Sequence, residues 1–357
     1  MALKLVGKGV ANYPYAVARV SAKRAKLLAP ADYEKALNMD VAEITRYIQD
    51  SAYKAEVDEL ASKFSGLDLL EAALTVNEER TYEQIRKLVG GAGGAIVNLF
   101  LDRYHYDDLK TLLRGKAGGA SRDELLREMV LENQETYDLF APLLGDDVKG
   151  VADVVAALQL QGGQARDWAA ILQKVPAGSS LSAYEDALDK AYYHRLLAGL
   201  HASSEKGNEA LVDFVRREVD TRNLLNAARW VAAGEPGDFT PYVIPGGRHL
   251  GIADVVALAK SPSLQAFSEA AAGTKIGAEA AGALESAGKS GKLGNLQAAL
   301  WRAHLADVDR LAHGHPLSLL PILLFLLRKH REVTILRAVA RGKAAGLSTE
   351  RLKELIV

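Results

Sequence analysis

Apolar side chains recur along most of the chain at intervals of three and four residues. Between residues 34 and 48, for example, Leu37, Val41, Ile44 and Ile48 follow one another at intervals of four, three and four. This spacing places them on one face of an α-helix. Aromatic residues make up only 6% of the chain, and no Asn-Gly or Asp-Gly turn separates alternating segments. We therefore predict an all-α protein.

Three short sequence elements recur, in the same order, three times along the chain. The first combines three apolar residues with an acid and occupies residues 41–44, 151–154 and 252–255. The second follows the pattern Leu-x-x-[Leu/Tyr]-[Glu/Gln]-x-Ala-Leu. Its copies begin at Leu67, Leu181 and Leu293, with offsets of 114 and 112 residues. This agreement of order and spacing indicates an internal repeat.

The third element is an arginine that precedes a glycine by five residues. The arginines are Arg114, Arg229 and Arg341, with offsets of 115 and 112 residues. On a helix, such a side chain often covers apolar surface while its charged end reaches water. Three arginines at equivalent positions can also surround a shared opening and bind a partner. The residues alone leave both interpretations open.

The repeat length sets the expected architecture. Common helical solenoid repeats are about 30 to 50 residues long, whereas a repeat near 115 residues has the size of a domain. We expect three helical lobes of similar topology, at residues 1–120, 121–236 and 237–357. The second should open with a helix, because Ser121 and Glu124 have the spacing of a capping box. The lobes can stand around an axis in a pseudo-threefold arrangement, or form a linear array.

Composition excludes several function classes. The chain has 357 residues and no cysteine, which rules out disulfides, thiolate nucleophiles and zinc fingers. Its 44 basic and 45 acidic residues give a net charge of -1, which argues against a partner such as nucleic acid. The longest apolar run, residues 317–327, is 11 residues long and contains Pro321. A spanning helix needs about 20 apolar residues, so we expect no membrane-spanning segment.

Candidate chemistry is weak. Residues 282–290 end in Gly-Lys-Ser but have one residue too many for a phosphate loop, and residues 90–94 lack the third glycine of a dinucleotide turn. We interpret both as interhelical loops. His313 and His315 have no flanking carboxylate at ligand spacing. We therefore expect no catalytic residue, no cofactor and no metal, although a buried pair of catalytic carboxylates stays an open alternative.

Charge is unevenly placed at the start of the chain. Before Asp32 there are six basic residues and no acidic one. Arg19, Lys23 and Lys26 have helical spacing within an expected helix at residues 12–28. This strip is either a solvated helix face or a surface that binds an acidic helix or lipid headgroups.

Four segments together resemble a known family, the C subunit of archaeal-type (A-type) rotary ATP synthases, which is equivalent to the d subunit of vacuolar ATPases. The segments are residues 13–28, 109–119, 218–224 and 323–357. The triplication also matches, because that family is built from three similar helical lobes. Val17 and Asp108 depart from the family pattern, where asparagine is usual, whereas Asn223 keeps it.

The resemblance implies a non-catalytic rotor subunit shaped as a helical funnel or socket. It would lie peripherally on the cytoplasmic face of the cell membrane, as a monomer within a hetero-oligomeric complex. Its partners would be the central stalk subunits and the membrane proteolipid ring, and it would transmit rotation during ATP synthesis or hydrolysis, coupled to protons or sodium ions.

Six basic residues are the candidates for partner binding: Arg19, Lys23, Lys26, Arg114, Arg229 and Arg341. Two other interpretations of the chain remain at this point. It can be a helical adaptor or scaffold of another assembly, or a helical enzyme with an unrecognised site.

Overall fold

A computed structural model of the protein describes residues 13–356, except 130, 132–133 and 204–207. Helices and their connections account for all the described residues, and no strand occurs among them. This confirms the predicted all-α class. The contacts divide the chain into two compact units. Among the described residues, the larger unit takes residues 13–188 and 325–356, and the smaller unit takes residues 189–324.

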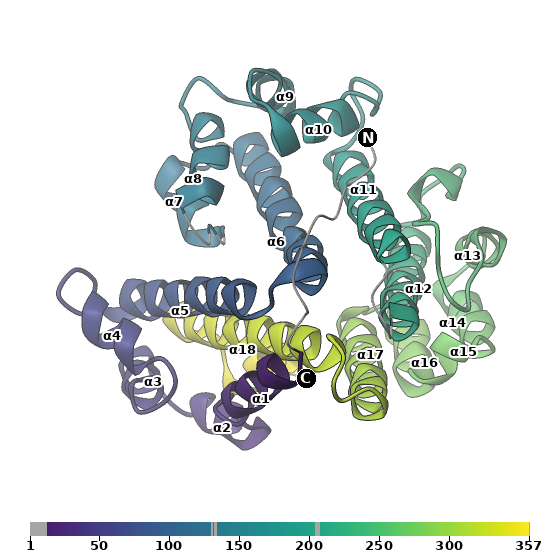
Figure 1. Cartoon of the computed structure of the whole chain (residues 1–357). Coiled ribbons are helices and arrows are strands. Elements are labelled where there is room, and N and C mark those ends of the chain that lie inside the picture. Colours follow the sequence, from purple (N-terminus) through teal and green to yellow (C-terminus); the bar gives the residue numbers. More distant parts are fainter. Residues whose placement is uncertain (1–12, 130, 132–133, 204–207, 357) are drawn as a thin grey trace. The chain divides into compact units, whose positions relative to one another are not determined.

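The larger unit contains the first ten helices, a short 3-10 helix and the last helix (Figure 1). Their bounds are α1 Tyr13–Arg24, α2 Pro30–Ala36, α3 Val41–Gln49, α4 Lys54–Leu60, α5 Gly66–Leu88, α6 Gly91–Gly118, α7 Arg122–Glu128, α8 Gln134–Phe140, η1 Ala141–Leu143, α9 Val151–Gln159, α10 Gly163–Leu172 and α19 Thr349–Ile356. Two long helices, α11 (Leu181–Ala202) and α18 (Leu320–Ala344), are shared between the units.

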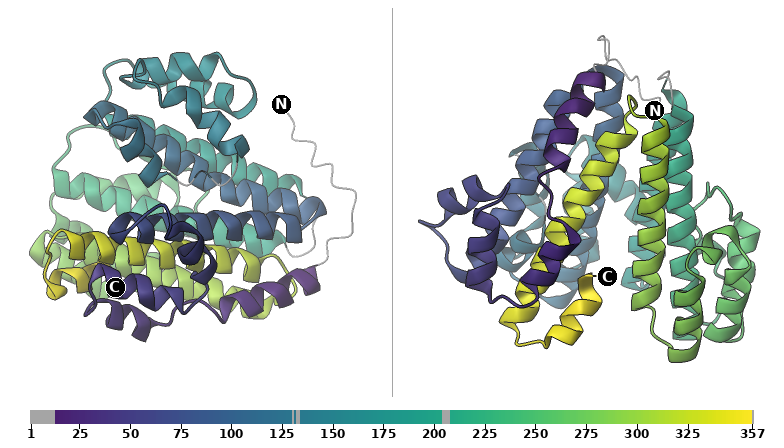
Figure 2. Two further views of the ribbon diagram at one scale, coloured as in Figure 1. Left: turned by 90° about the vertical axis from the view of Figure 1, so that its left-hand side faces the viewer. Right: turned by 90° about the horizontal axis from the view of Figure 1, so that it is seen from below.

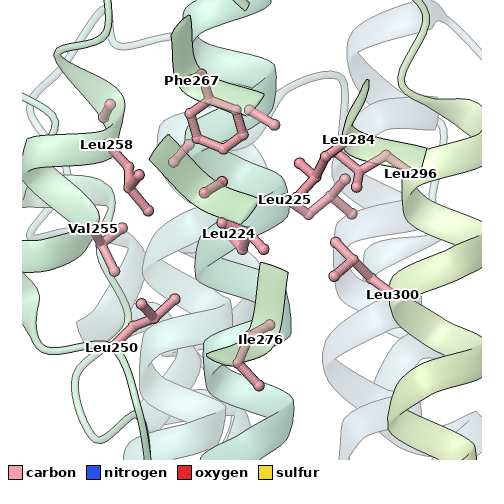
Figure 3. Close-up of a cluster of buried hydrophobic side chains, with 14 of the residues drawn as sticks. Leu224, Leu225, Leu250, Val255, Leu258, Phe267, Ile276, Leu284, Leu296 and Leu300 are labelled. Carbon is pink, nitrogen blue, oxygen red and sulfur yellow. The ribbon is translucent and has the colours of Figure 1, made fainter. Parts of the chain in front are cut away.

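The smaller unit is built on α12 (Asn208–Ala233) and α17 (Gly294–Gly314). Between them in sequence lie η2 Thr240–Tyr242, α13 Ile252–Ala259, α14 Leu264–Ala272, α15 Lys275–Ala278 and α16 Ala281–Ser290. Figure 3 shows their shared core, in which Leu224 and Leu225 of α12 face side chains of the short helices and of α17. The short helices thus fill the space along one pair of long helices.

The main core of the larger unit combines the first and last parts of the chain. Ile44 and Ile48 of α3 and Leu70 of α5 pack in one cluster with Leu336 and Val339 of α18. Figures 1 and 2 show α5 and α18 side by side, with the short helices α2 to α4 beside them. A helix of the third sequence copy therefore completes a core built by the first. The division into lobes at 1–120, 121–236 and 237–357 stays a prediction.

Helix caps follow from local sequence. The side chains of Asp40 and Ser121 each accept the backbone N–H three residues ahead. The carboxylates of Glu43 and Glu124 in turn accept the backbone N–H of Asp40 and Ser121, so both arrangements are capping boxes. The Ser121–Glu124 spacing predicted this arrangement. The first element of the repeat forms the starts of the short helices α3, α9 and α13, and its fourth residue is fully buried each time.

Three local expectations were wrong. Residues 282–290 lie in α16 rather than in a loop, and residues 91–94 form the first turn of α6. Helix α1 ends at Arg24, four residues before the predicted end at 28, so Lys26 lies in the following turn. The two glycine-rich segments were read as loops because glycine is a poor helix former. Gly288 has a packing reason, since a Cβ there would lie 3.2 Å from Ser268 Oγ.

Candidate functional site

The three repeated arginines make equivalent contacts. Each lies near the end of the second long helix of its copy and binds the fifth residue of the second repeat element in the next copy. Arg114 Nη1 on α6 donates to Glu185 Oε1 on α11 at 2.8 Å, and Arg229 Nη2 on α12 donates to Gln297 Oε1 on α17 at 3.0 Å. Arg341 on α18 binds Glu71 on α5. We call these three contacts the arginine clasps.

The Arg341 clasp is the most strongly charged. Its guanidinium donates to both carboxylate oxygens of Glu71 and, at 2.8 Å, to Glu128 Oε2 on α7. Burial alone would lower the pKa of Arg341, but the bonds and charges of these two carboxylates outweigh it and raise the pKa. Bidentate arginine–carboxylate geometry is the stronger form of ion pair. The Arg229 clasp, in contrast, has a neutral acceptor.

The glycines of the third repeat element end the long helices. Gly119, Gly234 and Gly346 have φ values of 74°, 65° and 71°, a left-handed conformation that favours glycine. In each copy the residue after the glycine donates to the carbonyl five positions back, at 2.8, 3.3 and 2.8 Å. These are Schellman caps. The repeated arginine–glycine spacing therefore joins a helix stop to an interhelical contact.

The signature at residues 218–224 holds a loop against α12. Asp220, fully buried, accepts the backbone N–H groups of residues 248, 249 and 250 at 2.8 to 3.1 Å. The Asn223 amide donates to Ile244 O and accepts from Ile244 N, both at 2.8 Å. A Cβ on Gly247 would overlap Asp220 Oδ1. These polar side chains form hydrogen bonds with buried backbone groups, a role that the sequence alone does not reveal.

An equivalent buried acid lies on α18. Glu332 stands nine residues before Arg341, as Asp220 stands nine before Arg229. It accepts the backbone N–H of Leu28 at 2.5 Å, the Tyr53 hydroxyl at 2.6 Å and Lys329 Nζ at 3.2 Å. Glu332 and Lys329 are almost fully buried. The acid fixes the segment after α1 and the start of α4 to α18.

A second polar group joins α5, α6 and α18. Glu78 of α5 is fully buried and accepts the Tyr82 hydroxyl at 2.6 Å, and it lies 2.8 Å from Nδ1 of His330. The ring of Tyr104, on α6, stacks on Tyr82 with centroids 4.8 Å apart and contacts His330. Burial by itself would raise the pKa of Glu78, but His330, Tyr82 and Arg337 outweigh it and lower the pKa.

The basic strip lies on α1 and the turn after it. Arg19 and Lys26 are exposed, whereas Lys23 is half-buried and its Nζ donates to Gln84 Oε1 on α5 at 2.5 Å. Burial, together with the charges of Arg19 and Lys26, lowers the pKa of Lys23. The three cations therefore lie close enough to repel one another, and their role in partner binding stays a prediction.

The predicted site residues thus fall into two groups. Of the strip at α1, Arg19 and Lys26 are exposed, whereas Lys23 is half-buried against α5. The three arginines are used in clasps within the chain, and whether they also surround an opening stays a prediction. The signal for the clasps was present in the sequence, because a glutamate or glutamine recurs at the fifth position of the second element. It was missed because one sequence does not show which repeated positions meet.

Two further features of the described residues concern metal binding and the membrane. Among the residues that the structure describes, no three His, Asp or Glu side chains gather as the ligands of a metal ion would. Within the same residues, none of the helices has the length and apolar character needed to cross a bilayer.

Comparison with known proteins identifies the family of the chain. The model of the ATP synthase (C/AC39) subunit family matches residues 16–355. The chain belongs to this family. It is similar to the C subunit of the A-type ATP synthase of Methanosarcina mazei, with 35% identity covering 98% of this chain and 94% of the relative.

Other archaeal relatives match over a similar length. The C subunit of the A-type ATP synthase of Methanosarcina barkeri is 34% identical over 98% of this chain and 94% of its own length. That of Haloferax volcanii is 31% identical over 98% and 99%. Family membership confirms the resemblance described above. The chain is a structural, non-catalytic subunit of the A-type ATP synthase class, and the enzyme interpretation is set aside.

Proposed function

We propose that the chain is the rotor subunit that links the central stalk of an A-type or V-type ATP synthase to the membrane proteolipid ring. In this role it transmits rotation between ion translocation and ATP synthesis or hydrolysis. The observation that carries the proposal is the family match over nearly the whole chain. Relatives named as the C subunit of the A-type ATP synthase support it.

The clasps support a mechanical role. The last long helix of the first copy binds the second copy, that of the second binds the third, and that of the third binds the first. A body that passes torque needs its long helices tied to one another at more than one point. Helices α5 and α6, of 23 and 28 residues, carry both apolar packing and these polar ties. We propose that three lobes linked in this order form a stiff socket for the stalk.

The location follows from the proposed role. We propose a peripheral position on the cytoplasmic face of the membrane, with the chain present once in a hetero-oligomeric complex. In this proposal, Arg114, Arg229 and Arg341 also contact the stalk or the ring. The Arg114 side chain is 53% exposed and that of Arg341 35%, so both keep a solvent-facing edge.

A pull-down from native membranes tests the proposal. The full chain carries an affinity tag, membranes are solubilised in mild detergent, and bound proteins are identified by mass spectrometry. The expected result is recovery of stalk subunits and proteolipid, with no ATP hydrolysis by the purified chain alone. Recovery of neither partner, or of an unrelated assembly, would favour the adaptor interpretation instead.

A further inference from the structure

Helix α1 has one buried and one exposed side. Ala16 and Val20 are almost fully buried against the larger unit. On a neighbouring side, Tyr15, Ala18, Arg19 and Ala22 are exposed and stand at positions i, i+3, i+4 and i+7 of the helix. Lys26 continues this side into the following turn. We call these five residues the outer face of α1.

The outer face combines an aromatic ring with cations that no acid of the described residues neutralises. The Tyr15 side chain is 52% exposed, although tyrosine is large and partly apolar. No acidic residue precedes Asp32, and Asp32 is itself engaged by Ala29 N, Lys35 and Tyr47. Burial and the neighbouring cations Arg19 and Lys26 lower the pKa of Lys23. The face thus has a local positive potential on a protein whose net charge is -1.

We infer that the outer face of α1, with Lys23 at its edge, lies against the anionic headgroups of a lipid bilayer. The inference rests on the proposed function, which places the chain at a membrane. Each lysine or arginine near an anionic bilayer strengthens binding roughly fivefold. Tyrosine is enriched at the level of the headgroups, because its ring is apolar while its hydroxyl group can contact water.

A lipid surface fits this face better than an acidic protein does. Protein interfaces gain most of their affinity from a few large side chains that fill pockets in the partner. Between the cations, the outer face presents only the methyl groups of Ala18 and Ala22, with Tyr15 at one end. A bilayer needs no matching pocket and no fixed register of acids, since its negative potential acts on every cation that approaches it.

Vesicle co-sedimentation of the purified full chain tests this inference. One set of vesicles is phosphatidylcholine alone, and the other is an equimolar mixture with phosphatidylglycerol. We expect binding to the anionic vesicles only, weakening as salt is raised. The variant Arg19→Glu, Lys23→Glu, Lys26→Glu should lose on the order of a hundredfold in affinity. Because α1 keeps its buried side, circular dichroism should show an unchanged helix content.

A charge-matched control separates the face from net charge. The variant Lys260→Glu, Lys275→Glu, Lys292→Glu reverses three exposed lysines of the smaller unit. It should bind anionic vesicles as the wild type does, and equal loss in both variants would overturn the inference. The inference is also overturned if the wild type does not bind anionic vesicles. It is overturned as well if the triple α1 variant binds these vesicles normally but recovers no protein partners in the pull-down. A pull-down that succeeds while vesicle binding fails leaves the proposed function intact.

Discussion

Two junctions between long helices occupy the same place in the sequence repeat but use different chemistry. At the junction of α18 with α5, Arg341 binds two carboxylates, and the buried Glu332 accepts from Tyr53 and Lys329 as well as from the backbone. At the junction of α12 with α17, Arg229 binds the neutral Gln297. Elsewhere on α12, the buried Asp220 accepts from the backbone N–H groups of the loop at residues 248–250.

The difference shows which feature the repeat preserves. Position is kept, since an arginine and a buried acid stand nine residues apart on both long helices. The partners of the arginine and of the buried acid differ between the two helices, because the residues that surround them differ. On α18 the buried acid binds side chains as well as backbone, whereas Asp220 on α12 binds the backbone of a loop. The α12–α17 junction has a charged contact of its own, in which Arg217 Nε on α12 lies 3.0 Å from Asp307 Oδ2 on α17.

The largest effect is expected from Asp220→Ala. This change leaves the N–H groups of residues 248–250 buried without an acceptor, which costs about 3 to 5 kcal/mol in the free energy of unfolding. Hydrogen exchange with mass spectrometry should show faster exchange in α12 and α13, with little change in α5. Asp220→Asn keeps one acceptor and should cost less. Equal exchange in Asp220→Ala and the wild type would contradict the structural role of the acid.

Arg341→Ala and Arg229→Ala form a matched pair. Loss of Arg341 removes two ion pairs and leaves the buried Glu71 without its cation, at a cost of about 1 to 2 kcal/mol. For Arg229, loss of the bond to the neutral Gln297 should cost about 0.5 kcal/mol. Urea unfolding of both variants measures the difference. If Arg229→Ala proves the more costly, the charged clasp is not the stronger one.

Gln297→Glu turns the neutral clasp into a charged one. The carboxylate would accept from Arg229 as Glu185 does from Arg114, adding about 0.3 to 1 kcal/mol to the free energy of unfolding at low salt. The gain should shrink as salt is raised, because the clasp is exposed. Glu185→Gln is the reverse change, and it should produce a loss of similar size. If the gain in the free energy of unfolding does not depend on salt concentration, packing and not charge is responsible for it.

The smallest effect is expected from acidification, which should change the free energy of unfolding in opposite directions through Glu78 and through Asp220. The pKa of Glu78 is lowered, so its stabilising contribution is complete above about pH 4.3, the ordinary glutamate value, and is lost as pH falls through the folded-state pKa. Burial raises the pKa of Asp220 despite its three N–H donors, so proton uptake by Asp220 favours the folded state in the acid range. Hydrogen exchange, corrected for its intrinsic pH dependence, should rise in α5 and α18 before α12. Glu78→Gln should abolish that rise.

Much of this fold could be predicted from local sequence. Helical spacing placed Ile44 and Ile48 on one face of a helix, and both are fully buried. The Ser121–Glu124 capping box was visible as a spacing of three. These features depend on residues a turn or less apart, and such information survives in a single sequence.

The rest depends on distant partners. Arg341 and Glu71 are 270 residues apart, and helical periodicity carries no information over that distance. Residues 282–290 were predicted as a loop because local propensity is weak, whereas contacts of α16 with α14 stabilise the helix. Gly288 belongs to that contact, because its missing Cβ lets Gln265 and Ser268 approach. Tertiary packing here outweighs propensity.

The packing of α18 into the core of α3 and α5 also has a consequence for synthesis of the chain. Leu70 and Leu74 are made early, but the residues that cover them, such as Leu336 and Val339, leave the ribosome more than 250 residues later. Until then these leucines remain available to chaperones or proteases. A polypeptide that lacks α18 therefore exposes apolar surface that the folded chain buries.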